Sequence, residues 1–375
     1  MIYLDNSSTT HHKPKSVIKS ATLGLTKYSI NPGRSGYKLA IETNEKVFTC
    51  REKLAEYLGA TPNNVIFTSG CTMAINLGLL GTARKNGHII TTTFEHNSVM
   101  RTLEKLKSTH NITYSVAMPN KNGQISPQEL SKYITNNTYM IIVNHTSNVS
   151  GVTQNIEAIG RLCRKHGLLF FVDGAQSIGH ETINMTEYNI NLLSVAGHKG
   201  LYAPQGIGAL LVNNISVSPL IFGGTGTYSD KLKQPTDIPD GLESGTQNIV
   251  GILGLSAGID FVAKNQTKIN EKITRLTNKL ILELNKIKYV ETYSGNPNSG
   301  VVSIVIKNKD SSLVSRILDE DFNIATRSGL HCALLAHKYY KTVKNGMTRI
   351  SLSYFNNEKD INKLIEAVRK IALEY

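Results

Sequence analysis

The chain has 375 residues, 40% of them hydrophobic and 18% charged, a composition typical of a globular protein with room for two domains. Its formal net charge of +13 comes without a block of like charges or an interleaving of arginine with aromatic residues, so we expect no direct nucleic-acid binding. The first residues lack the basic and apolar regions of a signal peptide, and no apolar run approaches the ~18 residues that span a bilayer. We therefore expect a cytoplasmic protein without a membrane partner.

The four cysteines are too few and too scattered for a disulfide framework, and no CxxC pair indicates a zinc site. Cys50 and Cys163 lie on the apolar sides of helix-like stretches, and we interpret both as core residues. Cys71 opens a helix-like stretch, where a thiol can be acidic, but we interpret it as a small turn residue. Cys332 lies in a predicted loop and is the cysteine to examine for chemistry.

From about residue 60 to residue 215, short apolar runs rich in β-branched residues alternate with helix-like patterns. This alternation indicates an α/β fold in which a mostly parallel sheet carries helices on both faces. Such sheets bind ligands beyond the carboxyl ends of their strands, so the residues after each strand are examined first. The predicted strands are 64–68, 88–93, 112–117, 140–145, 168–173, 192–196 and 206–212, with helices at 71–84 and 98–108 between the first three.

After about residue 255 the pattern changes to one long helix-like stretch followed by a mixture of strands and helices. We predict a large α/β domain over residues 15–255 and a smaller α+β domain made of residues 1–14 and 256–375. The predicted elements of the second part are the long helix 254–287, a strand at 301–307, a helix at 312–321, a strand at 348–355 and a last helix.

Three post-strand segments carry groups that suit a phosphorylated aldehyde cofactor. In FTSGCT, the amides of a helix start and the hydroxyls of Ser69 and Thr72 suit a phosphate, although a helix N-cap needs the same residue types. Asp173 ends a predicted strand, where a carboxylate is either a local cap or the partner of the ring nitrogen of pyridoxal 5′-phosphate (PLP). Lys199 lies in a glycine-flanked loop and is either a solvated lysine or one that forms an imine with an aldehyde.

The segment RSGLHCALLAH around Cys332 admits three interpretations. Cationic neighbours such as Arg327 and His331 are typical of nucleophilic cysteines. A small apolar residue that fills a gap would have the same identity. A metal site made by His331, Cys332 and His337 ranks last, because no fourth ligand is near in the sequence.

Taken together, these motifs, with YLDNSSTT near the start and RISLSYFNNE near the end, resemble the cysteine desulfurases. The resemblance is to the NifS/SufS-like enzymes in the class V aminotransferase branch of the fold-type-I PLP enzymes, and it covers nearly the whole chain. It implies conversion of L-cysteine to L-alanine, with the sulfur transferred to a persulfide on Cys332. It also implies a homodimer with a shared active site, and a sulfur-acceptor protein or scaffold as in iron–sulfur cluster assembly.

The resemblance also assigns roles to individual residues. Lys199 would be the Schiff-base lysine, Cys332 the nucleophile, and His96 a residue that stacks on the cofactor ring and moves protons. The implied cofactor-binding residues are Cys71, Thr72, His96, Asn148, Asp173 at the ring nitrogen, Gln176 at the phenolic oxygen, His198, Lys199 and, from the neighbouring protomer, Thr246. The implied substrate-binding residues are Asn148, Arg327 and Arg349, and no metal is implied.

Several alternative functions remain open. A selenocysteine lyase, or a cystine or cysteine C–S lyase, would carry every residue named up to the Cys332 loop. A class V aminotransferase would need no loop cysteine, and a non-catalytic PLP scaffold would need none of the groups. Two departures from the family pattern stand out: Ala196 replaces a frequent phosphate-binding serine, and Leu334 replaces a frequent proline after the nucleophile.

Overall fold

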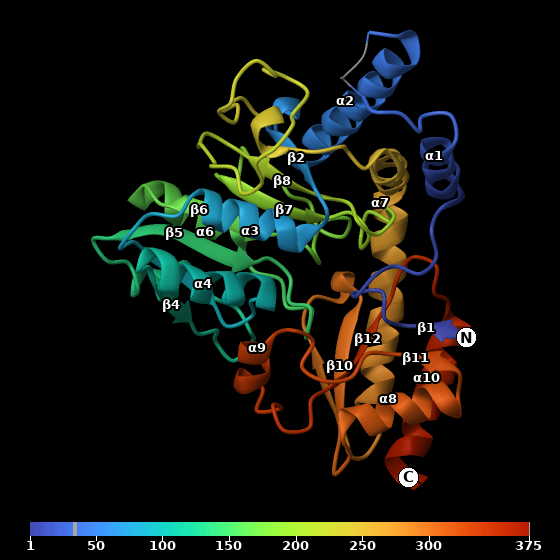
Figure 1. The fold of residues 1–375 in the computed structure, drawn as a ribbon. Coiled ribbons are helices and arrows are strands. Elements are labelled where there is room, and N and C mark those ends of the chain that lie inside the picture. The colour runs from blue at the N-terminus through green and yellow to red at the C-terminus, as the bar shows by residue number, and fades with distance from the viewer. Residues whose placement is uncertain (33–35, 375) are drawn as a thin grey trace.

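The computed structural model describes residues 1–32 and 36–374, and its larger part is built on a seven-stranded sheet (Figure 1). Six of these strands run in one direction, and β8 runs opposite to them. The strands in spatial order are β2 (Val65–Thr68), β8 (Gly208–Val212), β7 (Leu192–Ala196), β6 (Leu169–Asp173), β5 (Thr138–Asn144), β3 (His88–Thr92) and β4 (Thr113–Ala117).

Helices cover both faces of this sheet, which is why its strands are continuous apolar runs. Alternate residues of a strand point to opposite faces, and β5 shows this clearly. Its Met140 and Ile142 pack in a cluster with α3 and α4, whereas Ile141 and Val143 pack in a cluster with α2, α6 and α7. The helices of this part are α1 (Lys15–Leu25), α2 (Lys38–Leu58), α3 (Cys71–Gly81), α4 (Asn97–His110), α5 (Pro127–Ser131) and α6 (Ile156–His166), with η1 (Pro62–Asn64) and η2 (Asp240–Leu242) as short 3-10 turns.

The smaller part is a three-stranded antiparallel sheet packed against helices. Its strands, in the order β12 (Thr348–Ser351), β10 (Val301–Ile306) and β9 (Val290–Ser294), share one apolar cluster with α8 (Ser311–Glu320) and α10 (Glu358–Glu374). The long helix α7 (Ile249–Leu284) contacts α1 and α2 at one end and β9 at the other, and Figure 1 shows it running along both parts. The remaining elements are η3 (Pro297–Ser299) and α9 (Leu334–Tyr339).

The N-terminal strand β1 (Ile2–Tyr3) belongs with the C-terminal segment of the chain. It pairs in parallel with β11 (Ile324–Ala325), and Leu4 is buried in the cluster of the smaller part. The residues that follow then cross toward the large sheet, where the Thr10 amide donates to the carbonyl of His198 over 3.1 Å. The first ten residues therefore connect the two parts of the molecule.

The predicted fold class is confirmed, because the strands predicted between residues 60 and 215 form one mostly parallel sheet covered by helices. Three features were not predicted: the antiparallel direction of β8, the strand β9, and the pairing of β1 with β11. The predicted boundary at residue 255 lies within α7, and the division into two domains stays a prediction. No helix among the described residues combines the length and the hydropathy that a bilayer crossing requires.

The loop that carries Lys199 is fixed by close backbone packing at the carboxyl end of β7. A Cβ added to Gly200 would lie 2.1 Å from the carbonyl oxygen of Ile178, and one added to Gly179 would lie 2.4 Å from that of Gly200. No other residue type fits such an approach, so both glycines are needed for this packing of the backbone next to Lys199.

Candidate active site

A cavity of about 250 Å³ opens at the carboxyl ends of β5, β6 and β7, the edge that the sequence singled out. All the cofactor-binding residues that we predicted within one protomer line it, and Thr246 does not. The lining residues are Ser69, Gly70, Cys71, Thr72, Met73, His96, Ser98, Asn144, Asn148, Asp173, Ala175, Gln176, Ala196, His198 and Lys199.

The Asp173 carboxylate is held through one of its two oxygens. Oδ1 accepts hydrogen bonds from the Ala175 amide (3.0 Å), the Ser194 hydroxyl (3.3 Å) and the Cys71 thiol (3.4 Å). Oδ2 accepts none from the described residues, so it is free for a donor in the cavity. A carboxylate fixed in this way suits a protonated ring nitrogen, because one oxygen sets its orientation and the other stays available.

Lys199 extends into the same cavity with an amine that forms no hydrogen bond to any described residue. Desolvation lowers the pKa of Lys199, and the neighbouring Cys71 and Asp173 partly oppose this shift. A lysine with a lowered pKa has a larger neutral fraction at pH 7, and the neutral amine is the form that attacks an aldehyde.

One end of the cavity is suited to an anion. Helix α3 begins at Cys71 without a side-chain cap, and the hydroxyls of Ser69 and Thr72 have no hydrogen-bond partner in the described residues. His198 is close by, with a buried Nδ1 that also lacks a partner. Helix amides, hydroxyls and a ring nitrogen together match the acceptor oxygens of a phosphate.

His96 caps helix α4 and lines the cavity at the same time. Its Nδ1 accepts from the Ser98 amide over 3.1 Å, so in the neutral ring the proton resides on Nε2. Burial lowers the pKa of His96, which favours this neutral form. His96 is thus a fixed ring whose Nε2–H has no partner among the described residues.

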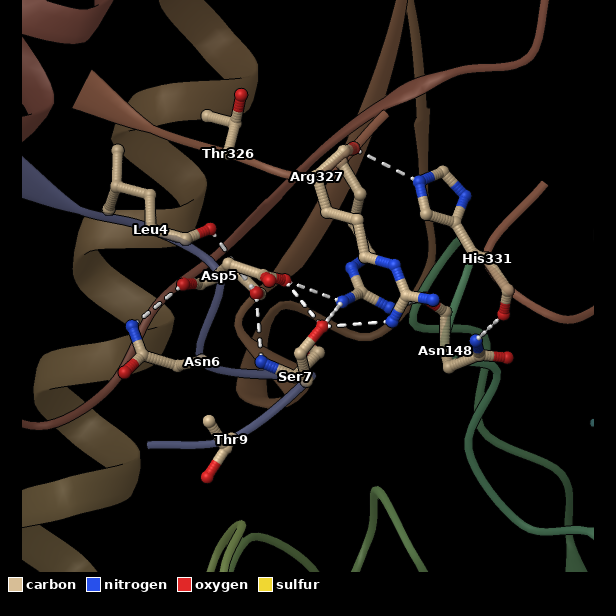
Figure 2. A network of polar contacts seen from close by, with 12 residues as sticks. Leu4, Asp5, Asn6, Ser7, Thr9, Asn148, Thr326, Arg327 and His331 are labelled. Atoms are coloured by element: carbon tan, nitrogen blue, oxygen red, sulfur yellow. Dashed lines mark hydrogen bonds and ion pairs between the residues drawn. The ribbon is translucent and has the colours of Figure 1, made fainter. Parts of the chain in front are cut away.

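Beside the cavity, two arginines meet the N-terminal segment in the network of Figure 2. Arg349 is fully buried and donates from Nη2 to Asp5 Oδ1 (2.7 Å) and to Ser8 Oγ (2.8 Å). Arg327 donates from Nη1 to the same Ser8 Oγ over 2.9 Å. Asp5 and Ser8 were not selected from the sequence, because nothing local marks residues whose partners lie more than 300 positions away.

The network also reaches the cavity wall, which places the two arginines next to it. Arg349 Nη1 donates to the carbonyl of Asn148 over 3.0 Å, and the Asn148 amide donates to the carbonyl of His331 over 2.6 Å. Arg349 Nε and Asn148 Oδ1 are buried without partners. A buried donor and a buried acceptor without partners are groups that a bound polar ligand would satisfy.

Cys332 does not line the cavity but is tied to its rim. Its carbonyl accepts from the Asn97 amide over 2.7 Å, one residue after the cavity-lining His96. The thiol is half-buried and receives a contact from Arg327 Nη2 at 3.6 Å. The structure therefore brings together the arginine and the cysteine that the sequence selected.

Two predicted residues lie apart from this arrangement. Thr246 is exposed and lines a second cavity, of about 290 Å³, which shares Ser69 and Met73 with the first. His337 is buried beneath the Cys332 loop, 3.2 Å from His331. Within residues 1–32 and 36–374, no group of three His, Cys, Asp or Glu side chains is arranged to hold a metal ion.

The chain matches the aminotransferase class-V family over residues 2–364. A probable cysteine desulfurase of Methanothermobacter thermautotrophicus is 32% identical over 99% of this chain and 94% of its own length. A cysteine desulfurase IscS of Clostridium botulinum is 30% identical over 99% of this chain and 94% of its own. The solved apo cysteine desulfurase of Thermococcus onnurineus has a TM-score of 0.91 and 29% identity, covering 99% of this chain and 94% of that one.

The chain belongs to the aminotransferase class-V family. Within that family its named relatives are cysteine desulfurases, so the resemblance stated from the motifs is confirmed. Enzymes of this family use PLP, and the groups around the cavity fit that cofactor. The free Oδ2 of Asp173, the unpaired amine of Lys199 and the partnerless Nδ1 of His198 are the observations that support the fit.

The environments of the four cysteines predict their reactivity. Burial raises the pKa of Cys50 to about 12 and raises those of Cys71 and Cys163 as well. A thiol whose pKa is raised stays protonated at pH 7.5, and the protonated form is a poor nucleophile. We expect iodoacetamide to label Cys332 alone in the native protein and all four cysteines after unfolding, as read by mass spectrometry of the peptides. Native labelling of Cys71 as fast as Cys332 would contradict the raised pKa of the Cys71 thiol.

Proposed function

We propose that the chain is a PLP-dependent cysteine desulfurase in which Lys199 holds the cofactor and Cys332 accepts the sulfur. The observation that carries this proposal is the pairing of two features. The unpaired amine of Lys199 and the free carboxylate oxygen of Asp173 face one cavity, and the Cys332 loop is hydrogen-bonded to the rim of that cavity. An aminotransferase needs the first feature but not the second.

The substrate carboxylate is assigned to Arg349, with Arg327 beside it. The partnerless Nε of Arg349 offers a buried N–H, and the fixed plane of the guanidinium suits a carboxylate better than an ammonium group does. The partnerless Oδ1 of Asn148 lies at the same wall and suits the substrate ammonium or a polar group of the cofactor. L-cysteine carries both charges, which fits the predicted substrate.

Proton transfer is assigned to Lys199 and His96. When bound, PLP supplies an electron sink that stabilises negative charge at the substrate Cα and allows the Cβ–S bond to weaken. Lys199 would be the base for the Cα proton of the bound substrate, because its lowered pKa suits proton transfer near neutral pH. His96 offers Nε2–H as a second proton carrier on the same cavity wall.

Sulfur transfer is assigned to Cys332. Its thiolate attacks the substrate sulfur, so that an S–S bond forms while the Cβ–S bond breaks and leaves its electron pair on the carbon fragment. Protonation of that fragment gives alanine, and the persulfide sulfur passes to a thiol of an acceptor. The contact from Arg327 Nη2 supplies positive charge beside the attacking sulfur.

A shared active site is assigned to a homodimer. Thr246 is exposed and lines a cavity that adjoins the cofactor cavity at Ser69 and Met73, which leaves its hydroxyl available to a second protomer. The exposed apolar side chains Ile221, Phe222 and Leu232 lie, like Thr246, between β8 and α7, and Ile221 lines the same cavity as Thr246. We expect these side chains to be buried in the dimer.

The cofactor assignment predicts that Lys199 is the point of covalent attachment. Protein reconstituted with PLP and then treated with borohydride should carry one adduct, on the peptide that contains Lys199. Lys199→Ala should lose the adduct, whereas Lys286→Ala, at an exposed lysine, should keep it. Mass spectrometry reads both results. An adduct absent from Lys199 in the wild-type protein would refute the assignment.

The nucleophile assignment predicts that a brief exposure to cysteine, without reductant, adds one sulfur to the peptide containing Cys332. Alanine and, with a reductant, sulfide should then appear in equal amounts. Cys332→Ala should still bind PLP and cysteine but should lose the persulfide and about 100-fold or more of the alanine production, a loss typical of removing a catalytic nucleophile. Cys163→Ala, at a buried core position, is the control. Full alanine production by Cys332→Ala would overturn the assignment, and a cysteine-to-selenocysteine rate comparison would then test for a selenocysteine lyase.

The shared site predicts that Thr246→Val weakens PLP binding about tenfold, because a hydrogen bond to a charged group is lost, and that Thr246→Ser does not. Mixing Thr246→Val with Lys199→Ala protomers should restore one high-affinity covalent site per heterodimer, measured by PLP titration and borohydride trapping. A fully loaded monomer at assay concentration would disprove the shared site.

A further inference from the structure

Beneath the Cys332 loop, three buried side chains form a hydrogen-bonded chain that the proposed chemistry does not use. His331 Nε2 lies 3.1 Å from the carbonyl of Arg327, and His331 Nδ1 lies 3.2 Å from His337 Nε2. His337 Nδ1 lies 2.8 Å from the hydroxyl of Thr342. All three side chains are at least nine-tenths buried, so each lost bond would leave a polar atom without water.

The protonation states of His331 and His337 follow from the hydrogen bond between His331 and the carbonyl of Arg327. The carbonyl of Arg327 can only accept, so His331 Nε2 must carry a proton. In a neutral imidazole Nδ1 is then an acceptor, which requires His337 Nε2 to donate and His337 Nδ1 to accept from Thr342. Each ring therefore has one tautomer and one orientation.

Both histidines stay neutral at physiological pH. Desolvation lowers the pKa of His331 to about 3 and that of His337 to about 4, and the nearby Arg349 contributes to the first shift. Neither ring can serve as a counter-ion of the Cys332 thiolate. Their separation, 3.2 Å between two ring nitrogens, is that of a hydrogen bond and leaves no space for a metal ion between them. The two histidines therefore act by holding the conformation of the Cys332 loop.

The geometry that they hold is an unusual one. His331 and Cys332 are consecutive non-glycine residues with left-handed backbone angles, φ 49° and φ 57°. Each costs of order 1 kcal/mol or more and persists only where surrounding contacts fix it. Three hydrogen bonds fix it here. The side-chain amide of Asn148 donates to the carbonyl of His331, and the backbone amide of Asn97 donates to the carbonyl of Cys332. The imidazole of His331 donates to the carbonyl of Arg327.

We propose that His337 is a positioning residue for Cys332: through His331 it holds the left-handed turn that presents the thiol beside Arg327 at the rim of the cavity. The proposal rests on the proposed role of Cys332 as the sulfur acceptor. It assigns His337 no contact with substrate or cofactor. His337 itself is separated from the thiol by His331, and neither ring is exposed enough to meet a ligand.

The test compares His337→Gln with His337→Leu. The glutamine amide offers a donor and an acceptor at about the separation of the two ring nitrogens, so it can bridge His331 and Thr342, whereas leucine cannot. In His337→Leu we expect a fall in single-turnover persulfide formation of about tenfold or more, because a displacement of about 1 Å can cost about 100-fold in rate. We expect KM for cysteine, PLP affinity and the Lys199 adduct to stay at wild-type values, and His337→Gln to recover most of the rate.

A second readout works without cofactor or substrate. The alkylation rate of Cys332 by iodoacetamide in the PLP-free protein should change in His337→Leu and return toward the wild-type value in His337→Gln. If His337→Leu does not fold, Thr342→Val replaces it, since it removes only the last donor, and Thr342→Ser is its rescue. Wild-type persulfide and alkylation rates in a folded His337→Leu would overturn the proposal. A wild-type protein that forms no persulfide on Cys332 would instead overturn the proposed function.

Discussion

The buried guanidinium of Arg349 joins three segments that are remote in the sequence. It pairs with Asp5 in the N-terminal segment and donates to the carbonyl of Asn148 after β5, while the Arg349 backbone exchanges two hydrogen bonds with the backbone of Arg327 before the Cys332 loop. A charge buried in this way must be paired, because removing one partner costs about 3–5 kcal/mol. Arg349 therefore holds together the N-terminal segment, the cavity wall at Asn148 and the strand that pairs with Arg327, and Figure 2 shows Asp5, Asn148 and Arg327 gathered in one network.

The two sides of the Cys332 loop differ in charge. The side toward the cavity carries Arg327 and Arg349, two cations that suit a carboxylate group and a thiolate. The side toward the core carries His331 and His337, which burial keeps neutral. A cationic histidine pair there would add two charges without counter-ions, so desolvation separates a charged functional face from an uncharged supporting one.

Cys71 shows how burial outweighs the effect of a helix end on the pKa of a thiol. Cys71 begins α3, a position at which the positive helix end lowers the pKa of a thiol. Its pKa is nevertheless raised, because desolvation and the neighbouring Asp173 both disfavour the thiolate. As a protonated thiol, Cys71 donates to Asp173 Oδ1 and helps to orient that carboxylate. In addition to its predicted place at the turn, Cys71 thus acts as a hydrogen-bond donor.

The sequence by itself determined the strands of the large sheet and the polar residues that follow them, including Asp173 and Lys199. Local periodicity carries that information, and parallel topology then gathers the strand ends at one edge. Only the tertiary structure decided what joins that edge to Cys332. The bonds of Arg349 to Asp5 and Ser8, the tautomers of His331 and His337, and the antiparallel course of β8 depend on contacts between distant segments, and no local pattern encodes such contacts because each arises from packing and desolvation of the folded chain.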